Sequence, residues 1–348
     1  MALQRLILDL GIDNEILNYQ PDALEGARYY IYNPTKLRHA VKRRNIARAF
    51  SMSPNRSMFV TFYREHMRWS KPVKNQLDAR KLSRHYDVFI CGSDQLWKPT
   101  SFNPLYYLSF CDDSAKRIAY GLSLGIERIQ DFNMRRARPY LEKFDAISLR
   151  EDLLREDMQD LLGKEVSRVC DPTLLFDSSF YLPLRSKDSA EGCLFCYFTK
   201  NGKQYPDIVS AFEKRFRKRI LLYAPECPAA REAHSDKVVY AGPSEWLANM
   251  SSAEAIITDS FHGTIFSLQF GKPFAFLDSL SGTSKKGQLG RIEDLLRLCQ
   301  EERRMIPAEA PIDALDALLQ TPDEYRFNAT RENIAEYSKA WLKKAIVY

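Results

Sequence analysis

The sequence lacks a long hydrophobic run: no stretch approaches the ~20 apolar residues that a membrane-spanning helix needs. A signal peptide is also missing, because the first residues, MALQRLILDLGIDNE, include neither a basic leader nor a small-residue cleavage site. Short internal repeats and low-complexity tracts are absent as well. These absences argue against a membrane-embedded or exported protein and predict a cytoplasmic chain of globular domains.

Cysteine is scarce and scattered. The chain has seven cysteines, an odd number, which fits reduced thiols. Cys193 and Cys196 have CxxC spacing, but they lie inside the strand-like run CLFCYF with no second Cys/His pair nearby. A metal or redox role for this pair is therefore disfavoured, and the sequence predicts no metal site.

Neither sign of charge dominates: 51 Lys and Arg against 45 Asp and Glu leave a net charge of +6. This mild excess suits an anionic small substrate or an anionic membrane surface. No nucleic-acid-binding motif accompanies it, so nucleic acid is not an expected partner. Part of the excess gathers in one basic region, residues 36–48, with Lys36, Arg38, Lys42, Arg43, Arg44 and Arg48. This region is either a solvated helix face or a peripheral contact with the inner face of the membrane or a lipid-linked acceptor.

Apolar strands alternate with amphipathic helices along the whole chain, a pattern typical of an α/β fold with mostly parallel sheets. The turn-rich stretch 177–192 interrupts this pattern and is the predicted linker. We predict an N-terminal domain over 1–178 with a basic helical region at 34–84, a C-terminal domain over 190–300, and a helical tail over 301–348. The predicted strands are 87–91, 116–120, 146–149, 165–169, 193–198, 219–223 and 237–240.

The most informative stretch is IITDSFHGTIFSLQFGKPF, residues 256–274. It reads as a strand, a tight turn, a helix and a second strand, with the polar residues where the first strand stops and the helix starts. A helix N-terminus offers free N–H groups to an anion. His262, predicted at that point, can also move protons near neutral pH.

Polar residues follow other predicted strands at their carboxyl ends. The first strand runs into Gly92–Gln95, the second into Gly121–Ser123, and the third into Arg150–Asp152. In open α/β sheets, ligands bind outside the carboxyl ends of the strands. Groups from both halves of the chain are therefore expected to meet in one cleft between the domains.

Six blocks occur in a characteristic order: GSDQLW at 92–97, KRIAYGLSLG at 116–125, ISLREDLL at 147–154, CDPTLLFD at 170–177, TDSFHGTIFSL at 258–268 and LGRIEDLL at 289–296. Together they resemble the polysaccharide pyruvyl transferase family over roughly residues 1–303. The resemblance implies two Rossmann-like domains facing a cleft, as in GT-B glycosyltransferases. It implies transfer of a pyruvyl group from phosphoenolpyruvate to two sugar hydroxyls, which gives a cyclic ketal and phosphate.

The resemblance also implies partners and a setting. Phosphoenolpyruvate is the donor substrate rather than a cofactor, and no further cofactor is expected. The acceptor is a sugar or a lipid-linked oligosaccharide. Such enzymes serve the assembly of capsule, exopolysaccharide or cell wall.

Four residues are candidates for the chemistry at the donor. His262 matches the histidine of the family's histidine-glycine block and is the acid–base candidate; the alternative is a histidine that only caps its helix. Arg150 and Arg291 are candidates for binding the phosphate and carboxylate, because a guanidinium binds such groups bidentately. The alternatives are an ion pair of Arg150 with a neighbouring carboxylate (Glu151 or Asp152) and an exposed helix arginine at 291. Lys272 is a weaker candidate for binding the same phosphate and carboxylate groups.

Four further residues complete the predicted site. Ser93, Asp94 and Gln95 form the polar turn of the first domain, and Asp94 is expected either to orient or deprotonate a sugar hydroxyl or to serve as a turn or cap residue. Ser260 is included as a substrate-binding residue, although with Asp259 it is better suited to shaping the turn before the helix.

Two features depart from the family pattern. Some members carry arginine and leucine just before the histidine, where this chain has Ser260 and Phe261, so anion binding is expected to rest more on Arg150, Arg291 and Lys272. The family also begins with a strand and a glycine-containing loop, whereas Ala2–Gln4 resembles the interior of the following helix. We therefore expect the first strand of the N-terminal domain to be missing.

Two alternative functions stay open. A nucleotide-sugar glycosyltransferase uses a similar architecture, but it needs a site for a base and ribose, and the second domain has no clear acidic ribose contact. A non-catalytic relative is the other alternative, since the loss of the first strand would remove a ligand-facing loop.

Overall fold

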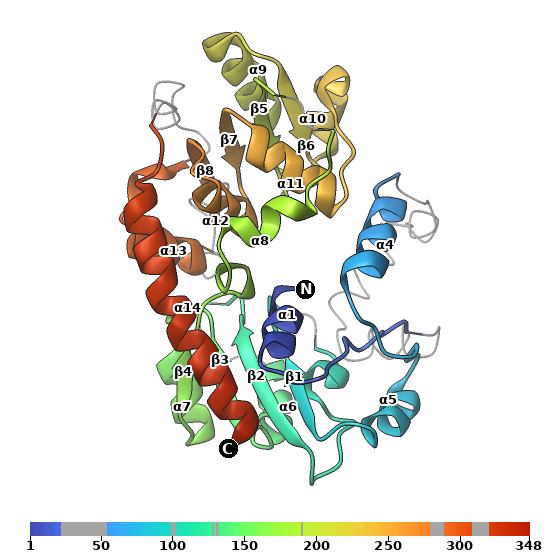
Figure 1. Cartoon of the computed structure of the whole chain (residues 1–348). Coiled ribbons are helices and arrows are strands. Elements are labelled where there is room, and N and C mark those ends of the chain that lie inside the picture. Colours follow the sequence, from blue (N-terminus) through green and yellow to red (C-terminus); the bar gives the residue numbers. More distant parts are fainter. Residues whose placement is uncertain are drawn as a thin grey trace. The chain divides into compact units, whose positions relative to one another are not determined.

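The computed structural model describes residues 1–21, 54–98, 102–126, 129, 132–188, 191–278, 289–307 and 320–348 (Figure 1). The chain divides into two compact units that interleave in sequence. Unit 1 consists of Met1–Met52, His66–Leu175 and Asn333–Tyr348; unit 2 consists of Ser53–Glu65 and Phe176–Glu332. The basic region 36–48 lies outside the described residues.

Unit 1 is built on a four-stranded parallel sheet of strand order β1-β2-β3-β4, as Figure 1 shows. Its strands are β1 (Val88–Cys91), β2 (Lys116–Leu122), β3 (Ala146–Leu149) and β4 (Val166–Arg168). Its helical elements are α1 (Ala2–Asp9), α5 (Gln76–Ser83), η3 (Pro104–Tyr107), α6 (Phe132–Leu141), α7 (Arg155–Leu162) and η4 (Pro172–Leu174). The C-terminal part of α14 (Glu324–Val347) also belongs to this unit.

The core of unit 1 is rich in aromatic rings. Trp97 stacks on Tyr107 with ring centroids 5.5 Å apart and meets Phe144 edge-on at 5.2 Å. All three side chains are almost completely buried. Trp97 belongs to the segment that follows β1, so this cluster anchors that segment in the core of unit 1.

Unit 2 contains a five-stranded parallel sheet of order β6-β5-β7-β8-β9. Its strands are β5 (Leu194–Tyr197), β6 (Ile220–Tyr223), β7 (Ala255–Thr258), β8 (Phe274–Asp278) and β9 (Met305–Pro307). Its helices are α4 (Pro54–His66), α8 (Ser178–Tyr181), α9 (Tyr205–Phe216), α10 (Pro228–Ala233), α11 (Pro243–Ser252), α12 (Phe261–Gln269) and α13 (Gly290–Cys299). Short 3₁₀ turns are η5 (Leu182–Leu184), η6 (Ser235–Lys237) and η8 (Glu302–Arg304).

Helices cover both faces of the unit 2 sheet. On one face, side chains of β5, β6 and β7 share an apolar cluster with Val209 and Phe212 of α9. On the other face, Trp246 of α11 packs edge-on against Tyr197 of β5 at 5.4 Å and against Phe266 of α12 at 5.1 Å. A parallel sheet buried on both sides is the Rossmann-like arrangement, so the predicted α/β class is confirmed.

Two local expectations were wrong. The predicted strand 237–240 is a single bridge between Leu222 and Val238, because the 3₁₀ turn η6 occupies the residues just before it. The predicted helical tail 301–348 contains the 3₁₀ turn η8 and strand β9, which pairs with β8, before helix α14. Segments as short as 237–240 and β9 contain too few residues for sequence pattern alone to separate a strand from a turn.

Candidate active site

The start of α12 places His262 at the carboxyl edge of the unit 2 sheet. Ser260 is the N-cap of this helix, and its Oγ accepts a hydrogen bond from the Gly263 N–H at 3.3 Å. Gly263 leaves room for the first turn to lie on β7, since a Cβ there would come within 2.4 Å of Thr258 Oγ1. His262 is the second residue of the helix and is partly exposed.

Asp259, between β7 and α12, fixes this turn. Its buried carboxylate accepts four hydrogen bonds, from the Thr199 N–H at 2.6 Å, the Thr199 hydroxyl at 3.0 Å, the Lys200 N–H at 2.9 Å and the Tyr205 hydroxyl at 2.8 Å. The segment after β5 is thereby tied to the start of α12. Asp259 shapes the turn, as the sequence predicted, and Ser260 caps the helix.

Arg291 and His262 are brought together through Phe261. Arg291 lies in the first turn of α13, and its guanidinium carbon is 5.0 Å from the centroid of the Phe261 ring, a cation–π contact. The His262 ring meets the same phenyl ring edge-on with centroids 5.5 Å apart. Phe261 therefore contacts both predicted site residues.

Lys272 lies at the other end of α12. It falls between α12 and β8, where the Pro273 carbonyl accepts from the Ile256 N–H near the start of β7. Burial lowers the pKa of Lys272, and the neighbouring Glu254 carboxylate opposes that shift. This is the amino edge of the sheet, so the structure does not bring Lys272 to His262.

Lys200 is a residue that the sequence analysis missed. It follows β5 at the carboxyl edge of the sheet, its N–H is held by Asp259, and its Nζ lies 5.8 Å from the centroid of the Phe276 ring in β8. Lys200 therefore adds a cation to the edge that carries His262. The rule that polar residues follow strand ends would have found it, since Thr199 and Lys200 come directly after the run CLFCYF.

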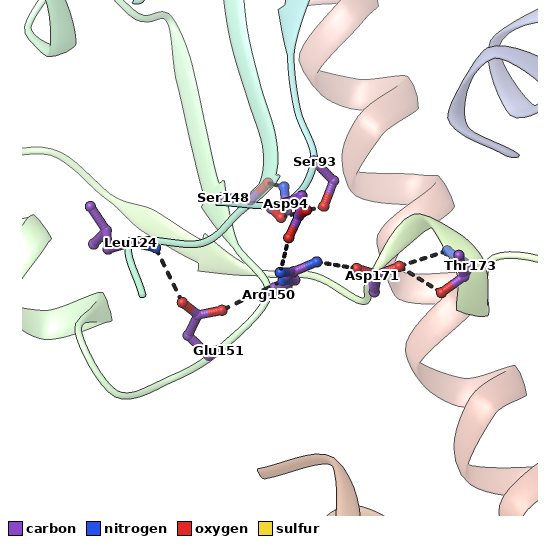
Figure 2. Close-up of polar contacts among 9 residues, drawn as sticks. Ser93, Asp94, Leu124, Ser148, Arg150, Glu151, Asp171 and Thr173 are labelled. Carbon is purple, nitrogen blue, oxygen red and sulfur yellow. Dashed lines mark hydrogen bonds and ion pairs between the residues drawn. The ribbon is translucent and has the colours of Figure 1, made fainter. Parts of the chain in front are cut away.

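Arg150 is the centre of a buried ionic cluster in unit 1 (Figure 2). Its Nη2 donates to Asp94 Oδ1 at 2.8 Å, its Nη1 donates to Asp171, and its Nε lies 3.8 Å from Glu151 Oε2. Only 1% of the Arg150 side chain is exposed. The ion-pair alternative is therefore what the structure shows, with Glu151 as one partner, while Asp152 pairs with Arg155 instead.

Electrostatics keep this guanidinium charged. Burial alone would lower the pKa of Arg150, but the carboxylates of Asp171, Asp94 and Glu151 outweigh it and leave the pKa raised. A buried cation of this kind is stable only when its charge is compensated by nearby partners, and here carboxylates supply them.

The polar turn after β1 is rigidly held. Asp94 has φ of 73° and its carbonyl accepts from the Ser123 N–H at 3.1 Å. The Ser93 hydroxyl donates to the Gly121 carbonyl at 2.7 Å, so it is engaged by backbone. The Gln95 side chain packs against Gly125, where a Cβ would come within 2.6 Å of Gln95 Nε2. Asp94 is the member of this turn that solvent reaches most clearly, with 60% of its side chain exposed.

Within the part of the chain that the structure describes, no three His, Cys, Asp or Glu side chains are arranged to hold a metal ion. Cys193 and Cys196 are both buried. None of the described helices combines the length and apolar character needed to cross a membrane.

The family model described as "Polysaccharide pyruvyl transferase" matches residues 1–281. The chain belongs to this family. Among curated proteins, none matches the sequence significantly.

Solved structures similar to this pyruvyl transferase family member share little sequence with it. They include a putative UDP-N-acetylglucosamine 2-epimerase from Listeria monocytogenes, with 12% identity, 84% of this chain and 87% of the other covered, and a TM-score of 0.44. The glycotransferase of kitacinnamycin has 12% identity, coverage of 78% and 79%, and a TM-score of 0.42. TarM has 13% identity, coverage of 79% and 58%, and a TM-score of 0.41. Likenesses this low carry no argument about the reaction.

For this pyruvyl transferase family member, the predicted site residues fall into two groups. His262, Ser260 and Arg291 gather in unit 2, and Arg150 gathers with Ser93, Asp94 and Gln95 at the strand ends of unit 1. The cleft that would unite the two groups stays a prediction.

Proposed function

We propose that this protein transfers a pyruvyl group from phosphoenolpyruvate to two hydroxyls of a sugar in a polysaccharide or its precursor, forming a cyclic ketal and releasing phosphate. Membership of the polysaccharide pyruvyl transferase family supports this proposal. The observation that carries it is the contact that both His262 and Arg291 make with the Phe261 ring at the starts of α12 and α13.

This arrangement suits a small anionic donor. Phosphoenolpyruvate carries a phosphate and a carboxylate, and a guanidinium and the N-terminus of a helix both favour such groups. Arg291 binds the donor in this proposal, and Lys200 adds charge at the same edge of the sheet. The imidazolium of His262 gives its proton to the methylene carbon of the donor, which leaves C2 electrophilic.

The two sugar hydroxyls and the departing phosphate complete the proposed transfer. The oxygen of one sugar hydroxyl adds to C2 and loses its proton, the C–O bond to phosphate breaks, and the second hydroxyl adds to C2 with loss of its proton. One of the two released protons restores His262, and the other leaves with phosphate or solvent. As proposed, this chemistry needs no redox partner and no cofactor.

The proposal predicts that His262→Ala lowers phosphoenolpyruvate-dependent phosphate release by ~10²–10⁴-fold, because general acid catalysis at carbon is lost. Phosphate release and ketal formation are measured with galactosides and mannosamine derivatives as acceptors. His85→Ala is the matched control, since His85 is an exposed histidine in unit 1, and it is expected to keep wild-type rates. Wild-type turnover in His262→Ala would refute the acid–base role.

The same assay separates the alternatives. A nucleotide-sugar glycosyltransferase would release a nucleotide from a sugar nucleotide and no phosphate from phosphoenolpyruvate. A non-catalytic relative would show neither reaction. No binding of phosphoenolpyruvate at millimolar concentration would favour the non-catalytic alternative.

The setting of the reaction is also part of the proposal. The acceptor is a sugar or a lipid-linked oligosaccharide at the cytoplasmic side, where capsule or exopolysaccharide precursors are made. Peripheral contact with the membrane would use the basic region 36–48. Vesicles with and without anionic lipid, sedimented with the protein, test that contact directly.

A further inference from the structure

The strand order of unit 2 creates a topological switch point between β5 and β7. The chain leaves β5 through α9 to reach β6 on one side of it, whereas β7, its neighbour on the other side, leads through α12 to β8. Since α9 and α12 cover opposite faces of the sheet, the segments that follow β5 and β7 diverge from each other. In open α/β sheets, ligands bind in the crevice between two such segments.

Asp259 ties these two segments together. It follows β7 directly, and its carboxylate accepts hydrogen bonds from the N–H groups of Thr199 and Lys200 in the segment that follows β5. The four donors are neutral, because they are these two N–H groups and the hydroxyls of Thr199 and Tyr205. Only 2% of Asp259 is exposed. The carboxylate is therefore turned toward the protein, where it fixes the backbone rather than contacting a ligand.

The tie fixes the point from which the Lys200 side chain extends. Its Nζ lies 5.8 Å from the centroid of the Phe276 ring in β8. β8 is two strands away from β5, since Tyr197 of β5 pairs with Thr258 of β7 and Thr258 pairs with Phe276. The Lys200 side chain therefore extends across the carboxyl end of β7, the strand that leads into α12.

Arg291 and His262 lie at the same edge of the sheet. The Arg291 guanidinium packs on the ring of Phe261, which begins α12 shortly after β7 ends, and His262 is the next residue of the helix. The positive charges of Lys200 and Arg291 thus lie around the carboxyl ends of β7 and β8, beside the N-terminus of α12. This combination attracts an anion with two charged groups, and phosphoenolpyruvate has a phosphate and a carboxylate.

We infer that Asp259 is a positioning residue of the donor site: by holding the segment after β5, it places the Lys200 ammonium beside the start of α12, where the ammonium binds phosphoenolpyruvate. The inference rests on the proposed function for the identity of the donor, and it concerns unit 2 alone. Lys200 contacts the donor, and Asp259 acts only through Lys200. No covalent step takes place at either residue.

Asp259→Asn tests the tie, because an amide accepts hydrogen bonds at only one of its two ends. Its oxygen can accept from the N–H of Thr199 or of Lys200, but its NH2 group then faces the other of these N–H groups. Whichever way the amide is turned, the segment after β5 loses one of its two backbone hydrogen bonds. The substitution keeps the size of the side chain, so it creates no cavity.

Lys200→Met shows whether Asp259 acts through the lysine. If it does, the effect of Asp259→Asn on donor binding disappears in the double variant, which a double-mutant cycle measures. Lys218→Met is the charge control, because Lys218 lies at the opposite edge of the same sheet, where it pairs with Glu254 just before β7. Val209→Ala is the stability control, because it makes a cavity in the apolar cluster of unit 2.

Phosphoenolpyruvate is titrated calorimetrically into each variant without a sugar. Lys200→Met is expected to raise the dissociation constant by about tenfold, since a hydrogen bond to a charged group is lost. Asp259→Asn is expected to raise it by about fivefold, and the double variant is expected to bind within about twofold of Lys200→Met. Both controls are expected to bind within about twofold of wild type, although Val209→Ala unfolds at a lower temperature.

Turnover assays distinguish positioning from a loss of stability. Asp259→Asn is expected to raise KM for phosphoenolpyruvate more than it lowers kcat, because ground-state binding of the donor is weakened. A loss of stability alone would reduce the amount of active enzyme and leave KM unchanged, as expected for Val209→Ala.

Hydrogen exchange in the wild type is a second measurement that needs no substitution. Phosphoenolpyruvate is expected to slow the exchange of backbone amides both at 199–204 and at 260–264. Slower exchange at only one of these segments would overturn the inference. Unchanged or tighter donor binding by Asp259→Asn, or additive effects in the double variant, would overturn it as well.

These experiments separate the inference from the proposed function. A wild type that binds phosphoenolpyruvate and shows the expected cycle, but releases no phosphate with any sugar, would overturn the proposed function and leave the inference in place. A wild type that turns over phosphoenolpyruvate but shows additive effects would overturn the inference alone. A wild type that binds no phosphoenolpyruvate would overturn both.

Discussion

At the scale of single residues, Asp259 and Arg150 each bring a charge into the buried edge of a sheet, and hydrogen bonds compensate both charges.

Asp259→Ala would remove the carboxylate that accepts four hydrogen bonds, so the donors of Thr199, Lys200 and Tyr205 would lose this acceptor. An unpaired buried donor costs ~1–3 kcal/mol. We expect a loss of about 3 kcal/mol in the stability of unit 2, seen as an earlier urea transition. Asp207→Ala, at an exposed aspartate of α9, should stay within ~0.5 kcal/mol of wild type, and an equal transition in both variants would contradict the role of Asp259.

The sequence predicted the roles and partners of these residues only in part. Asp259 and Ser260 follow an apolar strand and precede a helix, so their turn-forming role was readable from the sequence. The partners of Arg150 were not, because Asp94 and Asp171 are 56 and 21 residues away along the chain. A single sequence gives the charge of a side chain but not the carboxylates that the fold brings to it.

At the scale of elements, the approach of α12 to β7 depends on a residue without a side chain. Gly263→Ala would put a Cβ within 2.4 Å of Thr258 Oγ1 and 3.0 Å of Thr258 Cγ2, so the helix start or the strand must move. Overpacking of this kind costs ~1–3 kcal/mol. We expect a lower unfolding temperature and a displaced His262, and therefore lower phosphoenolpyruvate turnover. The double variant with Thr258→Ala should recover part of both losses, and wild-type stability of Gly263→Ala would show that the close approach is absent.

The elements themselves were largely predictable. Parallel, fully buried strands appear in sequence as short apolar runs, and β3 matches its predicted range. The sequence placed His262 where this helix starts, and the helix begins at Phe261, directly after its cap Ser260. Capping by a side chain, rather than hydrophobic pattern, decides where such a helix begins.

At the scale of the whole molecule, sequence pattern predicted two parallel sheets but not how the chain is shared between them. Most of α4 belongs to unit 2 and residues Asn333–Tyr348 belong to unit 1, each across a long gap in sequence. The Ala241 N–H donates to Asn55 Oδ1 at 3.1 Å, and Trp341 packs on Tyr120 with centroids 6.2 Å apart. An amphipathic helix shows that one face is buried, but its pattern does not name the sheet that it packs against.

The thiols of the whole molecule give a stability prediction in alkali. All seven cysteines are buried and free, and burial raises the pKa of Cys91 and Cys299 to about 12 and that of Cys170 to about 11. An unfolded thiol has a pKa of about 8.5. Between about pH 9 and 11 the unfolded chain therefore loses thiol protons that the folded chain keeps, so the free energy of unfolding falls as pH rises. Each thiol with a raised pKa lowers the free energy of unfolding by about 1.4 kcal/mol per pH unit in this window. The urea concentration at the midpoint of unfolding should decrease in the order pH 7, 9 and 10.5. Ellman's reagent at pH 8 should react slowly with the folded protein until denaturant exposes all seven thiols. A midpoint that does not change with pH, together with fast labelling of the folded protein, would show that the thiols are accessible.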